Sequence, residues 1–145
     1  MSETLVALVT GGATGIGAAC CRKLAAEGFR VGIHYRRSVE KAQKLLAELP
    51  DSFGVCADLT DTAEIDGMIK ELKQTAGRVD VLVNNAGVNV NAPMLAMNLA
   101  QYDSVTALAR STWYLSKLIL RRFMLRQGSG RIVNISSVVG HTGNP

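Results

Sequence analysis

The sequence predicts an α/β fold in which helices cover both faces of a doubly wound parallel β-sheet. Short apolar runs, typical of buried strands, alternate five times with segments whose apolar residues recur at helical spacing. No low-complexity segment or linker divides the chain. Because strand and helix alternate from end to end, we expect right-handed βαβ crossovers and one domain over residues 1–145.

The predicted strands are short runs rich in valine, leucine and isoleucine. The first, residues 5–9, is apolar without interruption, as expected of a strand buried on both faces. The third run is the weakest, and a glycine-rich break at residues 128–130 precedes the last. In chain order, we expect strands over residues 5–9, 30–35, 53–57, 79–83 and 132–135.

Start and stop residues delimit the predicted helices. Gly28 ends the first, Ser38 is a plausible N-cap of the second, and Pro50 ends that helix. Asp61 and Glu64 have the spacing of a capping box at the start of the third. A polar loop over residues 84–98 precedes a long fourth helix. We expect helices over residues 16–27, from Ser38 to Pro50, from Asp61 to Gly77, and over 99–127.

The overall composition is that of an ordinary globular protein. Hydrophobic residues make up 48% and charged residues 19%, which argues against a disordered chain. The net charge of +4 is too small to indicate nucleic-acid binding. No apolar run approaches the roughly 18 residues of a membrane span, and the start lacks a signal peptide's basic residues. We expect a cytoplasmic protein with no metal site, no nucleic-acid partner and no membrane partner.

The strongest chemical signal is a glycine-rich turn between the first strand and the first helix. Glycine allows a tight turn and lets the backbone approach a ligand closely. A helix N-terminus presents unpaired N–H groups and a partial positive charge, which favours a pyrophosphate. The motif is a variant of the dinucleotide fingerprint and consists of Thr10, Gly11, Gly12, Ala13, Thr14, Gly15, Ile16 and Gly17.

With two further motifs, this turn resembles the classical short-chain dehydrogenase/reductase family. Asn84-Asn85-Ala86-Gly87 follows the fourth strand, and Ile135-Ser136-Ser137 ends the fifth. The run over residues 130–140 is most similar to 3-oxoacyl-[acyl-carrier-protein] reductases. The resemblance implies a Rossmann-type sheet, with five of the family's seven strands present. It implies cofactor contacts by the glycine turn and by Asp58, Leu59, Asn85, Ala86 and Gly87.

The end of the second strand indicates NADP(H) as the cofactor. NAD-preferring sites hold an acidic residue there, whereas Tyr35 occupies this position and two arginines follow. A 2′-phosphate favours cationic, fork-shaped donors. We therefore expect Arg36 or Arg37, with Ser38, around the phosphate. The alternative is that both arginines are solvated loop charges.

The resemblance assigns Ser137 as the catalytic serine, with Ser136 as the second choice; alternatively both only cap the strand end. The family's Tyr-x-x-x-Lys pair does not occur in the sequence, and Leu108 stands in place of the family's asparagine. Free tyrosine has a pKa near 10, so it needs a nearby cation to act at neutral pH. We expect the pair beyond residue 145, which makes the domain C-terminally incomplete and the 145-residue chain alone inactive.

The sequence leaves two functions open. One is NADPH-dependent reduction of a carbonyl, small or bound to acyl-carrier protein. A 3-oxoacyl thioester is the favoured substrate, and a sugar or a steroid is the alternative. The other is a truncated, inactive NADP(H)-binding relative. Family resemblance implies a homodimer or homotetramer. The long helix ends in a basic group, which is either a docking surface for an acidic carrier protein or a solvated helix end; it consists of Arg121, Arg122 and Arg126.

Without the family's remaining strands, we expect the fifth strand to be an open apolar edge of the sheet.

Overall fold

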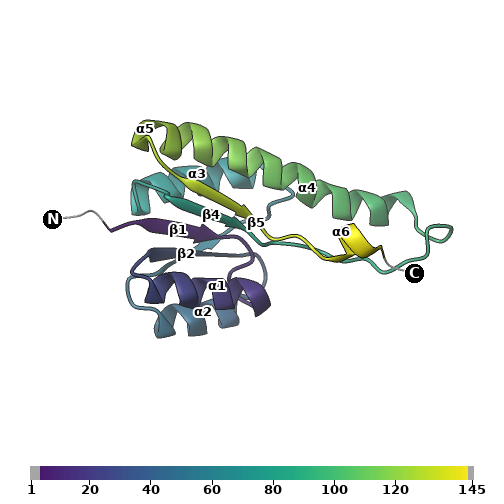
Figure 1. Ribbon diagram of the computed structural model, residues 1–145, viewed down its shortest axis with the longest axis horizontal. Coiled ribbons are helices and arrows are strands. Elements are labelled where there is room, and N and C mark those ends of the chain that lie inside the picture. Colours follow the sequence, from purple (N-terminus) through teal and green to yellow (C-terminus); the bar gives the residue numbers. More distant parts are fainter. Residues whose placement is uncertain (1–3, 144–145) are drawn as a thin grey trace.

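In the computed structural model, a five-stranded parallel sheet lies between two layers of helices (Figure 1). The structure describes residues 4–143, so both ends of the predicted domain fall outside the described part. The strand order is β3-β2-β1-β4-β5, which confirms the predicted Rossmann-type α/β fold. The strands are β1 (Val6–Val9), β2 (Arg30–Tyr35), β3 (Phe53–Cys56), β4 (Val81–Asn84) and β5 (Arg131–Asn134).

The crossover helices divide between the two faces of the sheet (Figure 1). One layer contains α1 (Gly15–Ala26) and α2 (Val39–Glu48). The other contains α3 (Thr62–Thr75), α4 (Leu99–Ile119), a single π-helical turn η1 (Leu120–Met124) and α5 (Leu125–Gln127). The last three form one continuous rod, as the sequence predicts, but the π turn was not predicted. A short helix, α6 (Val139–Thr142), follows β5 and was also not predicted.

Alternating side chains of the strands supply a separate core to each face. Leu8 and Val9 are neighbours in β1, and both are fully buried. Leu8 packs with apolar residues of α3 and α4, whereas Val9 packs with residues of α1 and α2. Burial on both faces explains why β1 is an uninterrupted apolar run.

The structure confirms both predicted N-cap positions, but not the predicted capping box. Ser38 does occupy the N-cap position of α2, but its side chain makes no capping hydrogen bond. Asp61 caps α3 by accepting from the Ala63 amide, yet the capping box does not close. The carboxylate of Glu64 instead accepts from the backbone N–H of Asp58 at 2.6 Å. Tertiary contact with the loop after β3 thus replaces the local contact that the spacing suggested.

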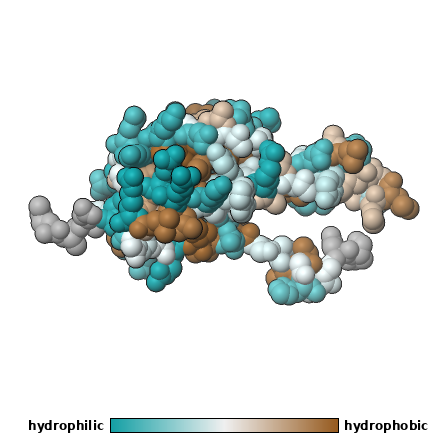
Figure 2. All heavy atoms as spheres, turned by 90° about the horizontal axis from the view of Figure 1, so that it is seen from above, coloured by the Kyte–Doolittle hydropathy of each residue, from teal (hydrophilic) through white to brown (hydrophobic). Residues whose placement is uncertain are grey.

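The edge strand β5 is exposed along its whole length, as predicted for an open apolar edge. Ile132 and Val133 are 37% and 45% exposed. Figure 2 shows two projecting segments, and apolar atoms lie on both. They are the loop entering α4, where Met94 and Leu95 are exposed, and the region of α6. Within residues 4–143, no helix is both long and apolar enough to span a membrane.

At the amino edge of the sheet, a buried carboxylate joins β1 to the segment before β4. Asp80 accepts hydrogen bonds from the Val6 amide at 2.8 Å and from Arg78 through both carboxylate oxygens at 2.8 Å. Gln127, at the end of α5, donates to the same carboxylate at 3.3 Å. Burial alone would raise the pKa of Asp80, but the hydrogen bonds and charge of Arg78 and the Val6 amide outweigh it and lower this pKa.

We predict that Asp80→Asn lowers the free energy of unfolding by about 2–3 kcal/mol near neutral pH, because Arg78 and the Val6 amide lose a charged acceptor. The folded-state pKa of Asp80 is depressed, so its contribution is present above the unfolded pKa of about 4 and is lost as pH falls further. Urea unfolding of both proteins, at neutral pH and below about pH 3, measures the difference.

The matched control is Asp51→Asn, which removes one exposed carboxylate from a turn whose positive φ of 69° asparagine tolerates. We expect this control to leave stability nearly unchanged. Equal effects of the two substitutions would contradict the role given to Asp80.

Candidate functional site

The carboxyl edge of the sheet contains a cleft at the point where the strand order reverses. β1 is flanked by β2 and β4, so the chain leaves β1 and β4 toward opposite faces. Ligands of open α/β sheets bind at such switch points. The cleft has a volume of about 810 Å³. The predicted cofactor residues that line it are Gly11, Thr14, Gly15, Ile16, Arg36, Asp58, Leu59, Asn85, Ala86 and Gly87.

Thr10 and Asn85 fasten the glycine-rich turn to the loop after β4. The Thr10 hydroxyl accepts hydrogen bonds from the amides of Asn85 and Ala86, both at 3.0 Å. In return, the Asn85 side-chain amide donates to the carbonyls of Thr10 and Gly11, at 3.0 and 3.1 Å. Thr10 is buried and does not line the cleft. Its role in this structure is therefore to hold the turn in place.

Gly17 is required by close packing within the turn. A Cβ at this position would overlap the carbonyl oxygen of Gly11 and lie 2.5 Å from Asn85 Nδ2. Gly12 is similarly enclosed, since a Cβ there would lie 2.9 Å from the Val9 carbonyl oxygen. Gly11 adopts a φ of +60°, in the left-handed region that favours glycine. Two of the predicted residues, Gly12 and Gly17, thus do not line the cleft but allow the close packing of the turn that does.

The N-terminus of α1 opens into the cleft through Thr14, Gly15 and Ile16. Within the described residues, the Thr14 side chain makes no capping hydrogen bond, and the first turn of α1 contains no acidic residue. First-turn amides have no partner inside their own helix and carry the positive end of its dipole. This surface therefore fits an anionic group such as a pyrophosphate.

A smaller hollow of about 210 Å³ adjoins the cleft at the end of β2. It is lined by Tyr35 and by the predicted phosphate residues Arg36, Arg37 and Ser38, together with Gly11, Ala13 and Thr14. The structure separates the two arginines. Arg36 pairs with Asp58, with Nη1 and Oδ2 3.0 Å apart, whereas Arg37 is exposed at the hollow.

Asp58 is held by Thr60 as well as by Arg36. Its Oδ1 accepts from the Thr60 amide at 2.9 Å and from the Thr60 hydroxyl at 2.7 Å. These bonds to Thr60, and then the charge and hydrogen bond of Arg36, lower the pKa of Asp58. The carboxylate therefore stays ionised at neutral pH, beside the cleft.

Ser137 lies outside the lining of this cleft. It follows β5 and is exposed, and its hydroxyl accepts from the Val139 amide at 3.3 Å, at the start of α6. Leu108, at the position where the family has an asparagine, lines the cleft and packs against the core. The geometry thus assembles the predicted cofactor residues but does not bring Ser137 to them.

Of the two alternatives for Arg121, Arg122 and Arg126, the geometry favours a solvated helix end. Gln127, at the end of the same helical rod, bonds to both the N–H and the C=O of Val79, at the amino edge of the sheet. The helix runs antiparallel to the strands, so its C-terminal arginines lie at the edge opposite the cleft. Their exposure agrees with a solvated helix end.

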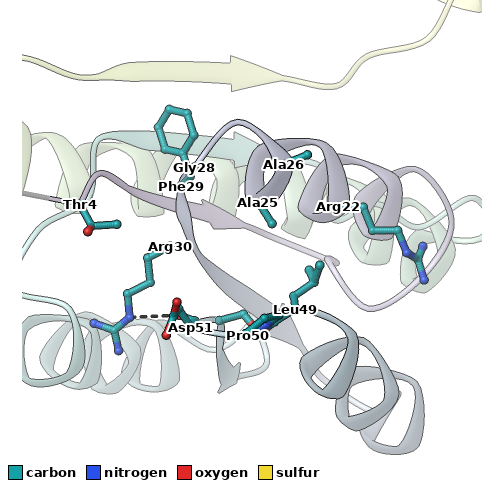
Figure 3. Close-up of a pocket in the computed structure, with 11 residues that line it drawn as sticks. Thr4, Arg22, Ala25, Ala26, Gly28, Phe29, Arg30, Leu49, Pro50 and Asp51 are labelled. Carbon is teal, nitrogen blue, oxygen red and sulfur yellow. Dashed lines mark hydrogen bonds between the residues drawn. The ribbon is translucent and has the colours of Figure 1, made fainter.

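A second hollow, of about 860 Å³, lies at that amino edge (Figure 3). Its arginines already have partners. Arg30 donates to the Asp51 carbonyl at 3.2 Å and stacks over Phe53, and Arg22 pairs with Glu48 at 2.8 Å. Because its arginines have partners and, among the described residues, no helix N-terminus lines it, we assign the candidate site to the carboxyl edge.

The sequence interpretation missed several residues of the cleft. One of them is His34, which is buried and forms part of the lining. The available signal in the sequence was a histidine near the end of a largely apolar predicted strand. The first turns of α4 could not be foreseen, because their place depends on the path of the long loop before them. They contribute Ala100, Asp103, Ser104 and Ala107.

Comparisons with known proteins agree with this geometry. The family described as short chain dehydrogenase matches residues 5–145. A 3-oxoacyl-[acyl-carrier-protein] reductase of Staphylococcus aureus is 41% identical over the whole chain, which covers 61% of that protein. An actinorhodin polyketide ketoreductase solved with NADPH has a TM-score of 0.92 at 33% identity, with 99% of this chain and 58% of the other aligned. A metagenomic short-chain oxidoreductase solved with NADP has a TM-score of 0.84 at 36% identity, over 97% and 65% of the two chains.

We predict that Gly17→Ala lowers the free energy of unfolding by about 2 kcal/mol or more, because the new Cβ overlaps the Gly11 carbonyl. Gly67→Ala is the matched control, since Gly67 also lies within a helix but has open space around it. There we expect a gain of about 0.5–1 kcal/mol from helix propensity. Denaturant unfolding measures both, and stabilisation by Gly17→Ala would refute the close-packing argument.

Proposed function

The chain belongs to the short-chain dehydrogenase family, and on that premise we propose that its carboxyl-edge cleft binds NADP(H) for carbonyl reduction. The observation that carries the proposal is the uncapped N-terminus of α1, which opens into a cleft whose turn is fastened by Thr10 and Asn85. The chain spans about three-fifths of the length of the relatives it matches. The proposal therefore concerns the polypeptide that also carries the remaining catalytic residues.

Three parts of the dinucleotide are assigned to surfaces of the cleft in this proposal. The first-turn amides of α1 are suited to the pyrophosphate, and Asp58 and Leu59, which line the cleft, are proposed to contact the adenine. Arg37 and Ser38 line the adjoining hollow and are suited to the 2′-phosphate. Tyr35 stands where an acidic residue would select the 2′-hydroxyl of NAD. The NADPH and NADP complexes of two related structures support this assignment.

For the reduction itself, the bound nicotinamide supplies a hydride to the substrate carbonyl. Ser137 is proposed to donate a hydrogen bond to the carbonyl oxygen, with Ser136 as the alternative. The protonating tyrosine and its lysine have no counterpart in the 145 residues, and Leu108 cannot relay a proton. We therefore propose that residues 1–145 alone bind the cofactor without turning over substrate.

The proposed substrate is a 3-oxoacyl thioester, small or carried on acyl-carrier protein. The support is the name of the Staphylococcus aureus relative, together with that of a Streptomyces violaceoruber protein described as a putative ketoacyl reductase of granaticin polyketide synthase. The latter is 37% identical over 95% of this chain. Assembly as a homodimer or homotetramer stays a proposal of the same kind.

We predict that Arg37→Ala weakens NADPH binding about tenfold and leaves NADH binding nearly unchanged, because a charge-assisted contact to the 2′-phosphate is lost. Lys44→Ala is the matched control, since Lys44 is an exposed cation of α2 that does not line the hollow. Dissociation constants from cofactor fluorescence measure both. Equal affinity of the unaltered chain for NADPH and NADH would refute the proposed 2′-phosphate site.

The activity is tested by NADPH oxidation with an acetoacetyl thioester, using the polypeptide that includes the Tyr-x-x-x-Lys pair. We expect Ser137→Ala to lower kcat about 100-fold, the loss typical of removing one hydrogen-bond donor to a reacting oxygen, with cofactor affinity unchanged. Ser136→Ala is the matched control. A large loss of activity in Ser136→Ala alone would assign the hydrogen bond to the substrate carbonyl to Ser136. Full activity in both variants would refute a catalytic role for either serine.

A further inference from the structure

A buried histidine connects two loops of the nucleotide cleft. His34 lies near the carboxyl end of β2, and only 3% of it is exposed. Its Nδ1 accepts a hydrogen bond from the Gly11 amide at 3.0 Å, and its Nε2 lies 3.0 Å from the Ala57 carbonyl oxygen. A backbone amide can only donate and a carbonyl can only accept. These partners therefore assign the neutral tautomer with the proton on Nε2.

The two partners belong to strands that do not touch. Gly11 follows β1 and Ala57 follows β3, and β2 separates these strands in the sheet. Backbone bonds support the same arrangement, from Gly12 to the His34 carbonyl at 2.8 Å and from Ala57 to the Tyr35 carbonyl at 3.2 Å. The imidazole thus holds the glycine turn and the loop of Asp58 at a defined separation.

We propose that neutral His34 is a positioning residue of the nucleotide site, and that its protonation releases the Gly11 amide and weakens binding of NADPH. The inference rests on the function proposed above and deepens it. His34 acts through the backbone rather than by touching the reacting atoms. In the protonated ring, an Nδ1–H would face the Gly11 N–H, so two donors would oppose each other across a contact that now measures 3.0 Å.

The surroundings of His34 favour the neutral ring at physiological pH. Burial lowers its pKa below 6.5, against the smaller opposing effects of the Ala57 carbonyl and of Asp58. The charged groups that line the cleft with it are Arg36 after β2, Asp58 after β3 and Asp103 of α4. The lining residues from the turn after β1 and the loop after β4 are uncharged. Because the pKa is depressed, the stabilising contact is present above about pH 6.5 and is lost as pH falls through the folded-state value.

Two substitutions separate the two hydrogen bonds of the ring. In His34→Asn, the side-chain oxygen can take the place of Nδ1 and still accept from Gly11, but the side chain is too short to reach Ala57. In His34→Gln, the side-chain amide can take the place of Nε2 and still donate to Ala57, but Gly11 loses its acceptor. Neither variant titrates. Each keeps one of the two contacts, so the pair controls for general damage to the fold.

The first test needs no cofactor. The ring nitrogens of His34 and the amide of Gly11 are followed by NMR between about pH 4 and pH 8, a range extended downward because burial lowers the pKa of His34 below its ordinary value of 6.5. We expect an Nε2–H tautomer near neutral pH and a Gly11 shift with the same midpoint as the ring. A proton on Nδ1 at neutral pH, or a Gly11 amide insensitive to the titration, would overturn the proposal.

The second test measures NADPH dissociation constants near pH 7.5 and at a pH below the His34 midpoint found by NMR, with the melting temperature of each protein as a fold control. At the higher pH, we expect His34→Gln to bind NADPH about tenfold more weakly than the unaltered chain. This is the loss expected when one buried amide has no acceptor. His34→Asn should bind within about threefold of the unaltered chain, with a weaker pH dependence. The 2′-phosphate titrates alike in all three and cancels in the comparison.

The outcomes distinguish the two proposals. Tight binding by His34→Gln with weak binding by His34→Asn, or an unchanged pH dependence in His34→Asn, would overturn the role of His34 while NADPH binding stands. If no protein binds NADPH but the Gly11 amide follows His34, the proposed function fails and the mechanical coupling stands. Loss of the coupling as well would refute both.

Discussion

The candidate site depends on the mutual fastening of Thr10 and Asn85. One hydroxyl accepts from two amides of the loop after β4, and one side-chain amide donates to two carbonyls of the turn after β1. The turn is thereby held with Gly11 against the start of α1, and the Gly11 carbonyl leaves no space for a side chain at Gly17. Without this fastening, the first-turn amides of α1 would have no fixed direction, and preorganised donors are what make such a surface a binding site.

The two edges of the sheet have opposite chemical characters. At the amino edge, the Asp80 carboxylate accepts hydrogen bonds from Arg78 and from Gln127, and these contacts stabilise the fold. At the carboxyl edge, backbone amides of α1 remain open to the cleft, and an ionised Asp58 lies beside it. A parallel sheet places all its strand ends of one kind on the same side. Stabilising contacts and binding groups can therefore gather at opposite ends of the same strands.

Sequence patterns predicted the strands and helices well, because burial makes a strand covered on both faces apolar throughout and a helix apolar along one side. The strands β1 and β2 and the helices α1 and α3 begin or end within two residues of their expected positions. The caps were less predictable. Glu64 bonds to the Asp58 amide rather than closing a box with Asp61, because the folded loop offers a competing donor that local spacing cannot reveal. The position of the arginines at the end of the long helix likewise depends on the direction in which that helix runs.

By itself, the sequence determined the α/β class, the glycine turn at the first strand–helix junction, and the family whose motifs it carries. These follow from periodicity and from glycine's freedom of backbone conformation, which are local properties. Only the tertiary structure decided that Arg36 pairs with Asp58 while Arg37 faces the hollow, and that His34 joins Gly11 to Ala57. Those contacts link residues 22 or 23 positions apart in the chain. They form because strand order brings the ends of β1, β2 and β3 together, which no local pattern encodes.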